Sequence, residues 1–122
     1  MRNTLNPILN TGIYVFTTES NLDHIPRSLA IMEFKEAEGT TLILKKEDAD
    51  QLGLNYNYEC AWITINAITQ LNDVGLTAKF STALAAAQVS CNVVAGFYHD
   101  HIFVDYQNGQ QAIELLKRLV WS

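Results

Sequence analysis

The segment from Ala61 to Ile68 restricts the fold more than any other part of the chain, because its side chains alternate strictly. One set of alternate residues is apolar and consists of Ala61, Ile63, Ile65 and Ala67. The other set mixes large and polar side chains, namely Trp62, Thr64, Asn66 and Ile68. Alternate side chains of a β-strand point to opposite faces of its sheet. The pattern therefore predicts a strand with one face packed on helices and a distinct second face.

The elements after this strand suggest how that first face is covered. A helix is predicted over residues 76–88, with one apolar stripe formed by Leu76, Phe80, Leu84 and Ala87. Strands are expected at 90–97 and 101–106. A last helix is expected to begin at Asn108, where Gln111 suggests a capping box, and to bury Ala112, Leu115, Leu116 and Leu119. The order strand, helix, strand, strand, helix predicts a crossover helix packed on one face of a sheet.

The first half of the chain shows a similar order. Strands are expected at 12–18, 30–34 and 40–44, followed by a short helix that ends at Gly53. A polar loop over residues 19–27 stands where the first helix of the second half would be. We interpret the chain as two copies of one unit, the first degenerate, with residues 1–57 in one copy and 58–122 in the other.

Composition narrows the classes of function. The chain has 122 residues, of which 48% are hydrophobic, enough for one compact core or two small subdomains that share one. The formal net charge of −5 disfavours binding to nucleic acid. No apolar run is long enough to cross a membrane, and no signal peptide is visible. With Cys60 and Cys91 interpreted as reduced core thiols, these features predict a cytoplasmic protein.

Four stretches carry a family resemblance: 74–78 with the helix after it, 90–96, 34–39 and 97–101. They resemble the ACT domain, and the whole chain is similar to a family of small stand-alone bacterial proteins with two ACT-like units. The resemblance implies an α+β fold: ferredoxin-like, ACT-type antiparallel sheets with helices on one face. It also implies regulatory binding of an amino acid at an interface between ACT units. One departure is that the second unit lacks a fourth strand after its last helix, so it borrows one from the first half or does without.

The loop from Asp73 to Thr77 is the main candidate ligand site, and its candidate residues are Asp73, Val74, Gly75, Leu76 and Thr77. Backbone N–H groups at a helix start attract a carboxylate. Gly75 would let a ligand approach the backbone closely, and Asp73 would pair with a ligand ammonium. The alternative is purely structural, with Asn72 or Asp73 capping the helix and Gly75 making the turn.

Further candidates lie in the hairpin of the second half. Tyr98 and His99 are candidate ligand or interface contacts. A metal site at His99 and His101 is not expected, because zinc needs three or four ligands and the third histidine, His24, lies in an unrelated loop. Asn92 interrupts an otherwise apolar strand, so it either contacts a ligand or faces solvent on the open side of the sheet.

Catalysis has little support in the sequence. Ser81, Ser90 and Cys91 lack an activating base at a diagnostic spacing, and no Gly-rich phosphate loop or cofactor motif is present. We therefore expect a non-enzymatic regulatory or sensor protein that binds a small molecule, without metal, cofactor, nucleic-acid or membrane partner. The alternative is an interaction protein that uses the sheet only to dimerise. A homodimer is expected in either case, since large side chains such as Trp62 and Phe97 exceed what two helices can cover.

Overall fold

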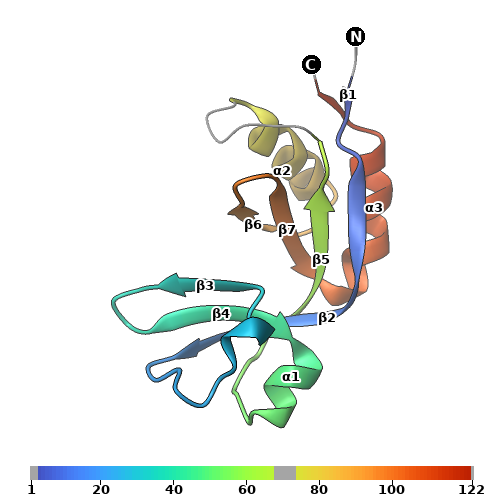
Figure 1. The fold of residues 1–122 in the computed structure, drawn as a ribbon. Helices are drawn as coiled ribbons and strands as arrows, with labels where there is room; N and C mark the ends of the chain where they lie inside the picture. The colour runs from blue at the N-terminus through green and yellow to red at the C-terminus, as the bar shows by residue number, and fades with distance from the viewer. Residues whose placement is uncertain (1–2, 68–73, 122) are drawn as a thin grey trace. The chain divides into compact units, whose positions relative to one another are not determined.

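The computed structural model describes residues 3–67 and 74–121, in which the chain forms eight strands, three α-helices and two short 3-10 turns. These elements make two compact units, which we describe separately. One unit comprises residues 12–60. The other, called the composite unit, comprises residues 1–11 and 61–122. The long strand β2 (Pro7–Glu19) belongs to both, since it leaves the composite unit at Thr11 and enters the 12–60 unit at Gly12 (Figure 1).

The 12–60 unit is a three-stranded antiparallel sheet with one short helix. Its elements are the second part of β2, the 3-10 turn η1 (Arg27–Leu29), β3 (Met32–Lys35), β4 (Thr40–Lys45) and α1 (Lys46–Gln51). The strand order is β3-β4-β2. The predicted loop is indeed present between β2 and β3, and it contributes a buried side chain, Ile25, where a helix would otherwise cover the sheet.

One face of this small sheet carries the core of the unit. Val15, Leu42 and Leu44 point to that face and pack with Ala49 of α1 and with Leu54. The chain reverses after α1 at Gly53, whose φ of 69° is the left-handed conformation in which glycine is favoured. The predicted C-terminal glycine of this helix is therefore confirmed.

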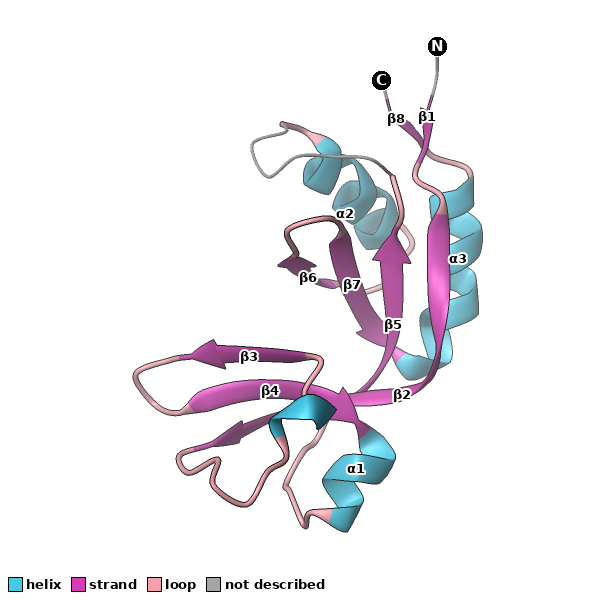
Figure 2. Cartoon of the chain, viewed as in Figure 1, coloured by secondary structure: helices cyan, strands magenta, loops and turns pink. Residues whose placement is uncertain are grey.

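The composite unit has a four-stranded sheet with order β2-β5-β7-β6 and a separate pair, β1 with β8. Its further elements are β1 (Asn3–Thr4), β5 (Glu59–Ile65), α2 (Leu76–Ala86), β6 (Asn92–Ala95), β7 (Asp100–Asp105), the 3-10 turn η2 (Tyr106–Asn108), α3 (Gly109–Lys117) and β8 (Val120–Trp121). Figure 2 shows the two longer helices, α2 and α3, beside these strands.

The core of the composite unit confirms the predicted periodicities. The apolar set of β5 and its extension is buried, as is the helical stripe of Leu76, Phe80 and Leu84. In α3 the buried residues are Gly109, Ala112, Ile113 and Leu116. Leu115, and Leu119 just after the helix, are only partly buried. The prediction of a capping box at Asn108 is wrong. The turn η2 leads directly into α3, so Asn108 has φ −98° and ψ 5° rather than an extended N-cap geometry, and its side chain makes no capping bond.

Contrary to the prediction, a short strand, β8, does follow the last helix, but it lies outside the four-stranded sheet. The fourth strand of that sheet is β2, which comes from the first half of the chain. Leu5 is fully buried in the core of the composite unit, and the Asn66 amide donates to the carbonyl of Asn6 at 3.2 Å. Strand β1 pairs with β8 through Asn3 with Trp121 and Thr4 with Val120. Of the two alternatives left open by the sequence, borrowing from the first half is therefore the one observed.

The two hairpins reveal the internal repeat. Strands β3 and β4 pair Met32 with Ile43 and Lys35 with Thr40, and strands β6 and β7 pair Asn92 with Phe103 and Ala95 with Asp100. Each residue of the second hairpin is numbered 60 higher than its counterpart, and a four-residue turn closes both. The predicted α+β fold with antiparallel sheets, built from two copies of one unit, is confirmed.

Candidate functional site

Helix α2 begins at the predicted ligand loop without a side-chain cap. Its N-cap residue is Gly75, with φ 95°, and the first turn contains no acidic side chain. The Lys79 amide donates to the Gly75 carbonyl at 3.0 Å, so the amides of residues 76–78 precede the first bond of the helix. Because glycine has no side chain, no hydroxyl or carboxylate of the N-cap residue competes for these amides.

The other residues of this loop differ in accessibility. Val74 is 87% exposed and Thr77 is exposed, whereas the Leu76 side chain is buried and anchors the helix start in the core. Asn72 and Asp73 lie outside the described residues. The alternative in which one of their side chains caps the helix therefore stays a prediction, while the N-cap position itself is occupied by Gly75.

The topology of the sheet brings some of the predicted site residues to one end. Figure 1 shows β5 and β7 running in opposite directions, so the end of β5 and the start of β7 lie at the same end of the sheet. The first leads to α2 and the second follows the turn that contains Tyr98 and His99. Asn92, at the start of β6, lies three residues before Ala95 and hence about 10 Å along the strand from this end.

The turn between β6 and β7 exposes two aromatic rings. Phe97 and Tyr98 are 76% and 75% exposed, and their rings contact each other edge to face at 5.0 Å. His99 is half-buried, and its Nδ1 atom is buried without a hydrogen-bond partner among the residues that the structure describes. These two features make the turn a candidate contact surface.

The helix-free face of the composite sheet carries a polar cluster that the sequence did not predict. Trp62 stacks on Phe103 with ring centroids 6.1 Å apart, and its indole Nε1 donates to Nδ1 of His101 at 3.0 Å. The side-chain amide of Asn10 donates to the Thr64 hydroxyl at 3.0 Å and to the Trp62 carbonyl at 3.2 Å. The alternation of residues 61–68 indicated this face, but the strands that complete it come from distant parts of the sequence.

The surroundings of His101 in this cluster favour its neutral form. Burial lowers its pKa below the usual value, the neighbouring His99 lowers it further, and Asp100 acts in the opposite direction. Nδ1 accepts the indole N–H bond, so the ring proton of the neutral form is placed on Nε2. The cluster is thus built around an uncharged imidazole.

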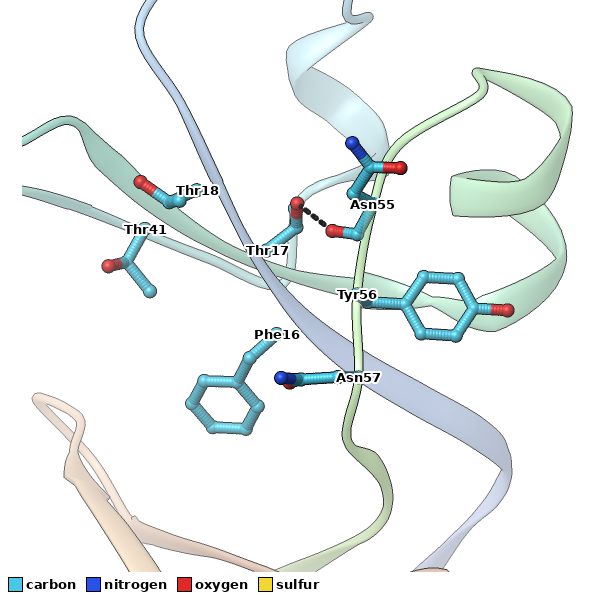
Figure 3. A pocket seen from close by; sticks show the side chains of 7 residues that line it. All are labelled: Phe16, Thr17, Thr18, Thr41, Asn55, Tyr56 and Asn57. Carbon is cyan, nitrogen blue, oxygen red and sulfur yellow. Dashed lines mark hydrogen bonds between the residues drawn. The ribbon is translucent and has the colours of Figure 1, made fainter.

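The 12–60 unit contains an open hollow of about 490 Å³ (Figure 3). It is lined by Phe16, Thr17, Thr18, Thr41, Asn55, Tyr56 and Asn57. The Thr17 hydroxyl donates to the Asn55 carbonyl at 2.7 Å and joins the segment after α1 to strand β2. Sequence reasoning missed this hollow, because its walls come from two strands and a loop with no shared motif.

Several other candidate chemistries find no support in the described part of the chain. There, no three side chains among His, Cys, Asp and Glu gather to hold a metal ion. Cys60 and Cys91 are free, with the buried Cys60 thiol 3.2 Å from the Tyr14 carbonyl and the pKa of Cys91 raised by burial. Over the same residues, no helix has the length and apolar character that a membrane crossing requires.

Antiparallel sheets with helices on one face, repeated twice, define a class of small α+β modules. Models of the ACT domain match residues 1–61 and again residues 57–118. The chain belongs to the ACT-domain family, with two ACT domains in tandem. Among functionally curated proteins, none matches the sequence significantly.

Solved structures agree with this assignment. A protein of unknown function from Vibrio cholerae, VC0802, is 43% identical, with 94% of this chain and 88% of that chain covered and a TM-score of 0.87. The regulatory subunit of aspartate kinase from Thermus thermophilus shares the fold at 8% identity, with 91% and 95% covered and a TM-score of 0.67. Aspartate kinase from Clostridium acetobutylicum does so at 11% identity, with 94% of this chain but 34% of that chain covered and a TM-score of 0.67.

Proposed function

We propose that this protein is a regulatory or sensor protein that binds a small molecule, an amino acid in the first instance, and catalyses no reaction. The observation that carries the proposal is the start of α2 at Gly75, an N-cap residue that supplies no side-chain cap. Membership of the ACT-domain family and the shared fold with an aspartate kinase regulatory subunit support it. We further propose a cytoplasmic location, consistent with two free thiols.

The chemistry of the loop suits the carboxylate of an amino acid. The amides that precede the first hydrogen bond of the helix and the positive end of the helix dipole both stabilise an anion at this position. Gly75 leaves the backbone open to close approach, and the exposed Val74 offers an apolar contact. In this proposal Asp73 pairs with the ammonium group of the ligand, while Tyr98 and His99 contact it from the turn at the same end of the sheet.

Replacing Gly75 with valine tests the proposed site. Valine is strongly disfavoured at a φ of 95°, so the loop must rearrange and the amides lose their positions. In a thermal-shift screen of the common amino acids, the wild-type protein should be stabilised by about 2.7 kcal/mol at a ligand concentration of 100 Kd. Gly75→Val should fold but show no such shift.

Gly53→Val is the matched control for this experiment. Gly53 also has a positive φ, 69°, but it follows α1 in the other unit and has open space around it. The Gly53→Val variant should lose stability because valine is disfavoured at this φ, but its stabilisation by the ligand should equal that of the wild-type protein. An unaltered shift in Gly75→Val would show that the site is elsewhere. No shift of the wild-type protein with any amino acid would favour the alternative function, an interaction protein that only dimerises.

We also propose that the protein is a homodimer. The exposed pair Phe97 and Tyr98 gives the composite unit an apolar surface that a second copy would cover. Two-fold pairing is the commonest closed symmetry for such a surface. Light scattering at micromolar concentration should therefore give about twice the chain mass of 13.7 kDa, and the variant Phe97→Ser should reduce this mass toward that of one chain. A monomer mass for the wild-type protein would contradict the proposal.

A further inference from the structure

The hollow of the 12–60 unit presents hydrogen-bond acceptors beside an aromatic ring. Thr18 of β2 and Thr41 of β4 are direct cross-strand partners, so their side chains lie on one face of the sheet. Figure 3 shows the Asn57 amide directed toward the Phe16 ring, while the Tyr56 ring points away from both. The volume of about 490 Å³ lies within the range of small-molecule sites.

The hydrogen bonds around the hollow leave oxygen atoms available. The Thr41 hydroxyl donates its proton to the Glu36 carboxylate, so toward a ligand its oxygen can only accept. The Tyr56 hydroxyl is engaged by Asp50 at 2.6 Å. Within the described residues, the side-chain amides of Asn55 and Asn57 have no hydrogen-bond partner. Each unpartnered amide can accept as well as donate, so the lining can receive a ligand that brings its own donors.

Charge distinguishes this hollow from the loop at α2. The 12–60 unit contains nine acidic and four basic residues and so carries the whole formal charge of −5, whereas the rest of the chain has four of each. None of the seven lining residues is charged. Asp50, which is bonded to Tyr56, forms an ion pair with Lys46 at 3.0 Å, so these two charges compensate each other. Glu36, which is bonded to Thr41, leaves one negative charge beside the lining. A cation is therefore favoured here and an anion disfavoured.

We propose that this hollow is a second binding site, for a small organic ammonium ion. The ammonium donates to the side-chain oxygen of Asn57 beside the Phe16 ring, and the face of Phe16 attracts the cation and covers its alkyl part. The inference does not depend on the amino-acid site at Gly75. That site lies in the composite unit and is suited to a carboxylate, so the two proposals can fail separately.

The test uses three ligands of one shape and different charge: n-butylammonium, 1-butanol and butyrate. Binding is followed on the full chain by NMR, through the side-chain amide signals of Asn55 and Asn57 and the backbone signals of residues 16–18. Butylammonium should shift these signals saturably, 1-butanol should bind at least tenfold more weakly, and butyrate should not bind. Equal effects of all three ligands, or none from butylammonium, would overturn the proposal.

Charge substitutions at Asn57 sharpen the test, because this residue is exposed and its replacement should leave the fold intact. Asn57→Asp should tighten butylammonium binding severalfold, and Asn57→Lys should abolish it. Gln51→Lys makes the same change of net charge at an exposed position of α1 that does not line the hollow, and it should bind nearly as the wild type does. If both lysine variants lost butylammonium binding equally, net charge alone would explain the loss, and this result would contradict a site at Phe16 and Asn57.

Discussion

Replacing Leu5 with alanine is expected to lower the free energy of unfolding by about 2–5 kcal/mol, although the residue lies close to the start of the chain. Leu5 is fully buried among residues of β5, α2 and α3, so its truncation leaves a cavity in the core of the composite unit. Urea unfolding followed by circular dichroism measures the change. Since domains of this size are stable by only about 5–15 kcal/mol, the loss should be plain in the midpoint.

Ile8→Ala is the control for this prediction. Ile8 lies on the same N-terminal segment but is 46% exposed, so its truncation should cost well under half as much. If Leu5→Ala were as stable as Ile8→Ala, the N-terminal segment would not be part of the core. That outcome would contradict the finding that the N-terminal segment of the chain completes the composite unit.

The second large effect is expected at Phe80. This ring is fully buried at the centre of the apolar stripe of α2, and its replacement by alanine should cost about 3–5 kcal/mol. The same urea titration measures it. Because this loss approaches the whole stability of a small domain, the titration is best made in the presence of sulfate, which strengthens apolar burial.

Phe34→Ala provides the comparison, because this ring is 63% exposed on β3 of the 12–60 unit. Its truncation should change the free energy of unfolding by about 0.5 kcal/mol or less. Similar losses in the two variants would mean that Phe80 is not packed as the structure shows. A large loss from Phe34→Ala alone would instead indicate that a second chain covers this ring in solution.

Two sites of opposite preference, one in each unit, would give a small protein two inputs. A carboxylate site at Gly75 and an ammonium site at Phe16 would respond to different ligands, or to ligands in different amounts. If binding at one site alters affinity at the other, linkage requires that the effect be reciprocal. Titrating each ligand in the presence of the other measures that coupling directly.

Much of the fold was predictable because it depends on local patterns. The alternation from Ala61 to Ala67 and the stripe of Leu76, Phe80 and Leu84 are set by the geometry of strands and helices, so they were visible without a structure. The left-handed turn at Gly53 was visible for the same reason. The capping box at Asn108 failed because a preceding 3-10 turn, which has no strong signal in the sequence, determined the backbone there.

For the candidate site, too, the local features were predictable from the sequence and the long-range contacts were not. The sequence by itself determined that a glycine precedes α2, and hence that a backbone site could exist there. Only the tertiary structure decided that Trp62, His101 and Asn10 meet on one face and that Phe16 lies beside Asn57. The physical reason is that these contacts join residues about 40 to 50 positions apart, and strand pairing at that distance depends on packing of the whole chain rather than on local preference.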